Sequence, residues 1–131
     1  VAGSGFVDII NTLVETQAGI YELQYKIEHD GAINRDDISN KNKIHIYRIL
    51  QETLHNIYKH AKAQKTYISF NLKNDVIWLV IKDDGVGFDV NKAKSGIGLK
   101  NINSRIKDIQ GSLNITSEKN KGTTIQIEIP L

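Results

Sequence analysis

Four polar side chains that could act as one group lie close together in the middle of the chain. They are Glu52, Asn56, Lys59 and His60. Spacings of three and four residues place side chains on one face of a helix. A carboxylate, an amide, an ammonium and an imidazole would then point in the same direction. Taken alone, the same pattern also describes a solvated helix face with incidental polar residues.

Two glycine clusters follow downstream. The stretch Asp83-Asp84-Gly85-Val86-Gly87-Phe88-Asp89 comes directly after an apolar run, and Gly96-Ile97-Gly98-Leu99 precedes a helical pattern. Glycines let backbone N–H groups approach a ligand closely, and a helix start supplies free N–H donors and partial positive charge suited to phosphate. Singly, each cluster also has a simpler interpretation, because glycine pairs mostly make turns and Asp83 could cap one.

Several common chemistries are excluded by their missing motifs. The chain has no GxxxxGK[ST] phosphate loop, no GxGxxG dinucleotide fingerprint, no HExxH and no GxSxG. It also has no cysteine, which excludes disulfides and thiolate metal sites and agrees with a cytosolic location.

Three helices are predicted to position these groups. The central one spans Asn42–Ala63, because its apolar residues recur at helical spacing: Ile46, Ile49, Leu50, Thr53, Leu54, Ile57 and Ala61. The first spans Phe6–Gln17, with Gly19 as its stop. The third spans Leu99–Gln110, with Leu99, Ile102, Ile106 and Ile109 inward and Gly111 closing it.

Alternating patterns predict five strands: Ile20–Glu28, Thr66–Lys73, Val76–Lys82, Ser112–Ser117 and Thr123–Ile129. The third is apolar without alternation, as in a central strand that is covered on both faces or contacts a ligand at one end. Its hairpin turn is Asn74-Asp75. We expect loops at His29–Asn40 and Glu118–Gly122, and a mobile segment at Val90–Ser95. The economical packing is an α+β fold, a two-layer sandwich of one sheet covered by three helices.

Length and composition describe one soluble domain. The chain has 131 residues, 40% of them hydrophobic, and a net charge of +2, too small to indicate a nucleic-acid partner. It has no run long enough to span a membrane and no signal peptide. Because it also has no methionine, we interpret it as a piece of a longer protein, with residues 1–5 as a linker or cloning scar and 6–131 as the domain.

In combination, the motifs resemble a known family. Glu52-x-x-x-Asn56-x-x-Lys59-His60, DDGVGFD, GIGLKNI with Arg105, and Gly122-Thr123-Thr124 are similar to the N, G1/F and G2 boxes and the closing threonine motif of the ATP-binding domain of bacterial sensor histidine kinases. This is the Bergerat, or GHKL, superfamily of gyrase, Hsp90 and MutL. The residues of these motifs are most similar to those of the nitrate-sensor and Gram-positive thermosensor subfamily. One departure is Asp84, where many relatives have asparagine.

The resemblance implies roles around the base. Asp83 would accept a hydrogen bond from the adenine amino group of ATP, and Thr123 would hold the ordered water beside it. The backbone of the two glycine clusters would surround the nucleotide, at Gly85, Gly87, Gly96, Ile97, Gly98 and Leu99.

It also implies roles around the phosphates. Asn56 would bind Mg²⁺, while Lys59 and His60 would approach the phosphate groups. Glu52 would be catalytic, and it could order the metal shell through a water.

The resemblance further implies partners. Nothing in the chain resembles the histidine-bearing dimerisation hairpin of these kinases: we place His29 in a loop, and His45, His55 and His60 on the central helix. The expected partners are that hairpin in a homodimeric parent and a response regulator, with the fragment itself monomeric. Two alternatives stay open: a self-contained ATPase or anti-sigma-type serine kinase of the same superfamily, and a nucleotide-sensing module without catalysis.

Overall fold

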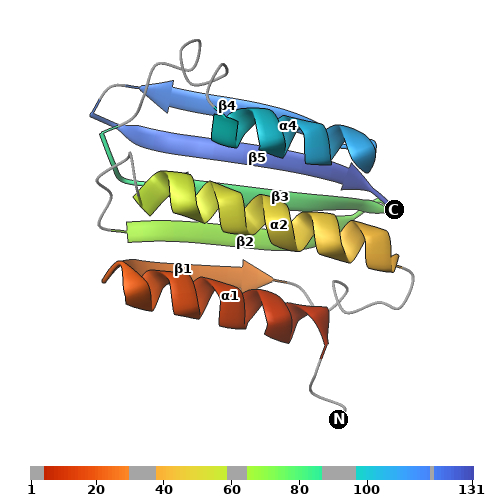
Figure 1. Cartoon of the computed structure of the whole chain (residues 1–131), viewed down its shortest axis with the longest axis horizontal. Coiled ribbons are helices and arrows are strands. Elements are labelled where there is room, and N and C mark those ends of the chain that lie inside the picture. Colours follow the sequence, from red (N-terminus) through yellow and green to blue (C-terminus); the bar gives the residue numbers. More distant parts are fainter. Residues whose placement is uncertain (1–4, 30–37, 59–64, 87–96, 119) are drawn as a thin grey trace.

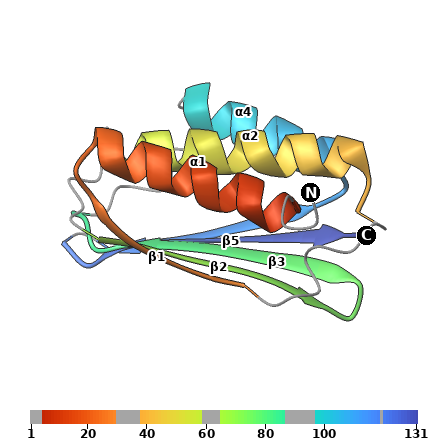
Figure 2. The same ribbon diagram turned by 90° about the horizontal axis from the view of Figure 1, so that it is seen from below.

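A five-stranded sheet carries three helices on one of its faces (Figures 1 and 2). The computed structural model describes residues 5–29, 38–58, 65–86, 97–118 and 120–131. The elements are α1 (Phe6–Ile20), β1 (Gln24–His29), α2 (Asn40–Asn56), β2 (Lys65–Lys73), β3 (Val76–Asp83), α4 (Ile97–Asp108), β4 (Ser112–Glu118) and β5 (Gly122–Pro130). The strand order is β1-β2-β3-β5-β4, with β1 parallel to β2 and the other pairs antiparallel. The predicted two-layer α+β sandwich is confirmed.

The core lies between the sheet and the helices. On β3, Ile77, Leu79 and Ile81 are buried against the helix layer, whereas Trp78 and Val80 between them are only half-buried on the other face. The prediction that this strand is central is confirmed. Of the two alternatives given for its apolar run, cover on both faces is wrong, because all three described helices lie on the same side of the sheet (Figure 2). The other, a ligand contact at one end, stays a prediction. The alternation of buried and half-buried residues could not be seen in the sequence, because Trp78 and Val80 on the open face are also apolar.

The first helix is longer than predicted, and the strand after it is shorter. The helix continues through Gly19 to Ile20, and Glu22 then takes a left-handed conformation with a φ of 54°. The N–H groups of Leu23 and Glu22 donate to the carbonyls of Ala18 and Gly19, at 2.9 and 3.4 Å, which is the hydrogen-bond pattern of a Schellman motif. A non-glycine residue therefore ends this helix, which is why Gly19 was a false stop signal.

Strand β1 also differs from the prediction. It begins at Gln24 and ends at His29, so His29 lies in a strand and not in the predicted loop. All its residues except Ile27 are exposed, since β1 is an edge strand, and the predicted half-buried alternation is wrong. The Tyr67 hydroxyl donates to a Glu28 carboxylate oxygen at 2.6 Å and helps to hold this edge against β2.

The central helix begins two residues before its predicted start. Ser39 caps it, because its side-chain oxygen accepts a hydrogen bond from the N–H of Asn42 at 3.1 Å. The described part of the helix ends with a π-type turn at Ile57 and Tyr58. Tyr58 stacks on Tyr21, with ring centroids 4.5 Å apart, and joins the C-terminal end of α2 to that of α1.

The third helix, α4, begins two residues before its predicted start and ends at Asp108. Gln110, with a φ of 58°, takes the left-handed position that had been expected of Gly111. Gly111 is required for a different reason, since a Cβ there would lie 2.8 Å from the carbonyl oxygen of Glu128. The buried face of the helix is as predicted, with Ile102, Ile106 and Ile109 in the core.

The two hairpins use left-handed turn residues. Asn74 and Asp75, with φ of 55° and 60°, form the predicted two-residue turn, and the pair of positive φ values is that of a type I′ turn. In the second hairpin Gly122 has a φ of 87°, and a Cβ there would overlap the carbonyl oxygen of Asp83. Only glycine lets β5 begin this close to the end of β3.

Some predictions fall outside the described residues. They concern Ala61, the side chain of Leu99, most of the loop after His29, and Val90–Ser95. Among the helices that the structure describes, none is both long and apolar enough to cross a membrane.

The two glycines Gly122 and Gly19 offer a matched test of this packing. Gly122→Ala should lower the free energy of unfolding by about 1 to 3 kcal/mol or more. The variant would combine a strained φ with an overlap between the new Cβ and the backbone of Asp83. Gly19→Ala should leave stability unchanged or raise it by up to about 1 kcal/mol, since the space around Gly19 is open and the residue lies in a helix. Urea unfolding of both variants measures the difference; equal effects would contradict the close approach at Gly122.

Candidate functional site

Polar side chains from three neighbouring strands meet at one end of the sheet. In the strand register Thr66 lies opposite Asp83, and Asp83 lies opposite Thr123. Directly opposed residues project from the same face of a sheet. We call these three residues the Asp83 row. In Figure 1 the start of β2, the end of β3, the start of β5 and the C-terminal end of α2 all lie at this left-hand end.

Asp83 is the central residue of the row. Its carboxylate is half-buried and accepts a hydrogen bond from the N–H of Gly85 at 2.8 Å. Burial raises its pKa above the ordinary value, and the negative charge of Asp84 raises it further, while the backbone N–H groups of Gly85 and Thr123 oppose the rise. When it is ionised, this carboxylate can only accept hydrogen bonds, and it is already partly shielded from water.

The raised pKa of Asp83 has a defined sign for stability. The stability that this group contributes is fully present below its unfolded pKa and is lost as the pH rises through the higher folded pKa. The ionised form of Asp83 therefore lowers the free energy of unfolding relative to the protonated form. A carboxylate whose ionised form costs stability is more readily explained by a function than by folding.

Thr123 completes one side of the row. It is buried, and its hydroxyl lies 2.9 Å from the hydroxyl of Ser117 on the neighbouring strand β4. Ser117 Oγ is also 3.4 Å from the carbonyl oxygen of Gly122. Ser117 was missed at the sequence level. It could have been found in the sequence from its position opposite Thr123 in the predicted β4–β5 hairpin.

Asp84 has a different partner. Its carboxylate accepts a hydrogen bond from the N–H of Lys65 at 3.0 Å, and its own N–H donates to the carbonyl of Lys65 at 3.3 Å. These two bonds hold the end of β3 to the start of β2. An amide oxygen could accept the first bond equally well, so the aspartate that departs from the family pattern does not disturb the row.

The second hairpin closes over the same region. The N–H of Asn120 donates to the carbonyl of Val86 at 2.6 Å, so the β4–β5 turn contacts the segment that follows Asp83. Gly85 is buried beneath it. The close approach of Gly122 to Asp83 and this hydrogen bond together fix the backbone around the carboxylate.

Glu52 and Asn56 come to this end of the molecule on α2. The apolar side of the helix is buried, including Ile49, Leu50 and Leu54, and this orients the polar side. Both polar side chains are partly exposed, and Asn56 is the last residue of the helix. The predicted shared face is therefore compatible with the observed helix for these two residues. Lys59 and His60 lie outside the described residues.

The start of α4 contributes backbone groups. Ile97, Gly98 and Leu99 form its first turn, where N–H groups have no partner within the helix. Gly87 and Gly96 lie outside the described residues. Glycine-rich backbone followed by a helix start is suited to an anion, as the sequence pattern indicated.

The oxygen donors present suit Mg²⁺ held by few protein ligands. The described residues contain no cluster of three or more histidine, cysteine, aspartate or glutamate side chains arranged to hold a metal. Mg²⁺ is commonly held by one or two protein oxygens, with waters and phosphate oxygens completing its shell. An amide oxygen of Asn56 with Glu52 behind a water fits that requirement.

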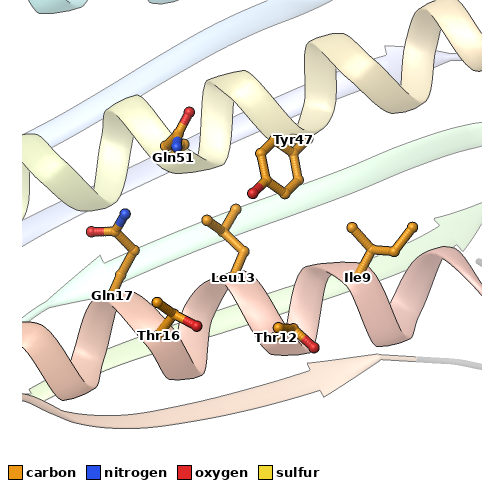
Figure 3. A pocket seen from close by; sticks show the side chains of 7 residues that line it. All are labelled: Ile9, Thr12, Leu13, Thr16, Gln17, Tyr47 and Gln51. Atoms are coloured by element: carbon orange, nitrogen blue, oxygen red, sulfur yellow. The ribbon is translucent and has the colours of Figure 1, made fainter.

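A groove also lies between α1 and α2, on the helix layer (Figure 3). Its volume is about 340 Å³, and it is lined by Ile9, Thr12, Leu13, Thr16, Gln17, Tyr47 and Gln51. The lining contains no carboxylate and no basic side chain, and it includes no member of the Asp83 row. The end of the sheet, with its perturbed carboxylate, is therefore the better candidate for chemistry.

Comparison with known proteins identifies the family. Residues 41–131 match the model of the family described as histidine kinase-, DNA gyrase B- and HSP90-like ATPases. This chain belongs to that ATPase family. The resemblance to the ATP-binding domain of this family is confirmed, whereas the nitrate-sensor and thermosensor subfamily stays a prediction.

Relatives of this ATPase domain include two histidine kinases. It is 35% identical over 112 residues to the sensor histidine kinase LiaS of Bacillus subtilis, a match that covers 85% of this chain and 31% of LiaS. It is 39% identical over 90 residues to the histidine-protein kinase/phosphatase DegS of Brevibacillus brevis, covering 68% and 23%. The chain thus spans about a third or less of the length of these relatives.

Solved structures share its fold. The histidine kinase domain of a blue-light activated histidine kinase from Erythrobacter litoralis superposes with a TM-score of 0.80 at 17% identity, covering 97% of this chain and 61% of that one. The histidine kinase AdeS of Acinetobacter baumannii gives 0.77 at 16% identity, covering 96% and 64%. At these identities the likeness shows the fold of the ATPase domain alone.

The interaction between the two acids of this ATPase domain can be tested directly. Asp84→Asn should lower the pKa of Asp83 towards its ordinary value, because it removes the neighbouring charge while an amide oxygen still accepts from Lys65. Asp84→Ala should also lower that pKa, but it should cost up to about 1 kcal/mol of unfolding free energy more than the asparagine variant, because the hydrogen bond is lost. Carbon-13 NMR titration of the Asp83 carboxyl and urea unfolding measure both effects. An unchanged Asp83 pKa in Asp84→Asn would contradict the electrostatic coupling.

Proposed function

We propose that this domain binds Mg-ATP and donates the γ-phosphoryl group to a histidine on a separate dimerisation domain of its parent protein. The single observation that carries the proposal is the half-buried Asp83 at the end of the central strand, between two buried threonines and beside a glycine that permits close backbone approach. Membership of the ATPase family supports ATP as the ligand.

The base would be recognised at the Asp83 row. The carboxylate of Asp83 accepts a hydrogen bond from the adenine amino group, which guanine lacks at that position. Thr123, whose hydroxyl is oriented by Ser117, holds a water between the carboxylate and the ring. Gly85 and Gly87 let the backbone approach the base.

The phosphates would lie between α2 and the start of α4. Backbone N–H groups from Gly96 to Leu99 bind their oxygens, and Lys59 and His60 add positive charge. Asn56 would ligate Mg²⁺, which supplies charge neutralisation for the phosphate groups. Glu52, one helical turn before Asn56, is proposed as the catalytic acid that orients the incoming histidine or the metal's water shell.

The remaining parts of the proposal concern the parent protein. Residues 6–131 would be one ATP-binding domain, with residues 1–5 as a linker. The parent would be a homodimeric sensor kinase whose ATP domain lies on the cytosolic side and whose phosphohistidine passes its phosphate to a response regulator. The names of the relatives support this assignment.

Nucleotide binding is the first test. Mg-ATP at about 100 times its Kd should add about 2.7 kcal/mol of stability and raise the melting temperature by several degrees. GTP should do much less, because Asp83 cannot accept from a guanine carbonyl edge. Thermal unfolding with each nucleotide makes the measurement.

The matched variants are Asp83→Asn, which should abolish the shift with the fold intact, and Asp84→Asn, which should keep it. Equal shifts with ATP and GTP would refute the adenine site.

Phosphoryl transfer is the second test. The fragment alone should hydrolyse ATP very slowly and should not label itself with radioactive phosphate. Addition of the parent's histidine-bearing hairpin should give acid-labile, base-stable label on the hairpin. Glu52→Gln should slow this transfer more than it weakens ATP binding, because its role is proposed for the reacting geometry.

Two outcomes would favour other members of the superfamily. Rapid hydrolysis by the fragment alone would indicate a self-contained ATPase, and acid-stable phosphate on a partner's serine would indicate a serine kinase.

A further inference from the structure

Thr66 is a buried threonine whose hydroxyl has no hydrogen-bond partner in the described part of the chain. The side chain is 2% exposed. Its Oγ1 is inaccessible to solvent and makes no hydrogen bond there. A buried hydroxyl without a partner costs free energy, which makes it a feature that requires an explanation.

The other two buried threonines of the described residues are satisfied. Four further buried polar atoms there also lack a hydrogen-bond partner, but none belongs to the Asp83 row: Asn11 Oδ1, His45 Nδ1, Tyr58 Oη and Trp78 Nε1. Thr53 donates to the carbonyl of Ile49 at 2.7 Å, and Thr123 pairs with Ser117 at 2.9 Å. Both bonds can be made within a helix or a hairpin. Thr66 differs in that it lies directly opposite Asp83 in the sheet.

The register places Thr66 and Asp83 as a directly opposed pair. Cβ atoms of such a pair are about 4.5–5.5 Å apart and lie on the same face. The two side chains make no direct hydrogen bond, and one oxygen of the carboxylate is already used by the N–H of Gly85. In this structure the hydroxyl is closed to a molecule the size of water, so a water can enter between it and the carboxylate only after a small displacement of the side chains. Such a water would have polar partners on two sides.

We propose that Thr66 is a positioning residue of the adenine site: with the Asp83 carboxylate it holds an ordered water on the side of Asp83 opposite Thr123, and this water contacts the bound base. The Thr66 hydroxyl donates to the water, and the water donates to the carboxylate, which leaves its remaining positions for the amino edge of the ring. Asp83 is thereby flanked by one hydroxyl-held water on each side. This inference rests on the proposed function of the Asp83 row.

Two substitutions separate the hydroxyl from the methyl group of Thr66. Thr66→Val keeps the shape and removes the hydroxyl, so the affinity for ATP should fall about threefold to tenfold, the net worth of one hydrogen bond (about 0.6 to 1.4 kcal/mol). Thr66→Ser keeps the hydroxyl and should bind ATP within about twofold of the original protein. Thr116→Val, the same change at an exposed position of strand β4, should leave the affinity unchanged. Isothermal titration calorimetry measures each Kd.

The apo protein supplies a second readout. Thr66→Val should unfold at the same or a higher urea concentration, because it removes an unpaired buried hydroxyl. Thr53→Val should unfold at a lower one, because its hydroxyl is bonded. If the valine variant of Thr66 does not fold, Thr66→Ala replaces it in the binding measurement, again against Thr66→Ser.

Each result decides the matter. An affinity that falls in Thr66→Val and is retained in Thr66→Ser supports the water-holding role. Unchanged affinity in Thr66→Val, or equal losses in both variants, would overturn this inference while ATP binding by the original protein still stood. Absence of ATP binding by the original protein would overturn the proposed function and this inference with it.

Discussion

A carboxylate kept half-buried at the end of the central strand is the constraint on which the rest of this structure depends. Burial disfavours the ionised form of Asp83, so the surroundings must supply compensating dipoles without filling the space beside it. The N–H groups of Gly85 and Thr123 do so from the backbone. Gly122 lets the start of β5 approach the same segment, because a Cβ there would overlap the carbonyl oxygen of Asp83.

The hydrophobic core determines which way this carboxylate points. Side chains alternate along a strand, and Ile77, Leu79 and Ile81 bury the face that also carries Asp83. A slip of one residue would turn the whole set to the open face and expose the isoleucines. Burial of the core residues therefore also orients the side chain of Asp83, although those residues are themselves apolar. The same holds for α2, whose buried arc orients Glu52 and Asn56.

The sequence predicted the elements well where periodicity and turn chemistry agreed. All eight described elements, the turn at Asn74-Asp75 and the inward residues of α2 and α4 were predicted from patterns of residue type. The misses have a common cause in residues with more than one conformational option. Glu22 and Gln110 end helices in left-handed conformations that sequence rules assign to glycine, and Gly19 continues a helix that it was expected to end.

The site was less predictable than the fold. Asp83 and Thr123 could be named because the order of motifs resembled a family, whereas Thr66 and Ser117 carry no motif. Their importance depends on strand register, that is, on which residue lies opposite Asp83 and which lies opposite Thr123. Pairing between strands is set by the whole sheet, so a single sequence indicates it only after the hairpins have been assigned.

The two adjacent aspartates show how position divides one residue type into two roles. Asp84 is exposed and joins β3 to β2 through the N–H of Lys65, a task that requires one oxygen acceptor and no charge. Asp83 points to the opposite face, towards the helices, where the proposed adenine contact would need an acceptor without a donor. Asparagine can therefore replace aspartate at position 84 of this fold without loss of the backbone contact, whereas the proposed role of position 83 would require a carboxylate. Of the two adjacent aspartates, Asp84 therefore has a structural role, and Asp83 is the candidate for a functional one.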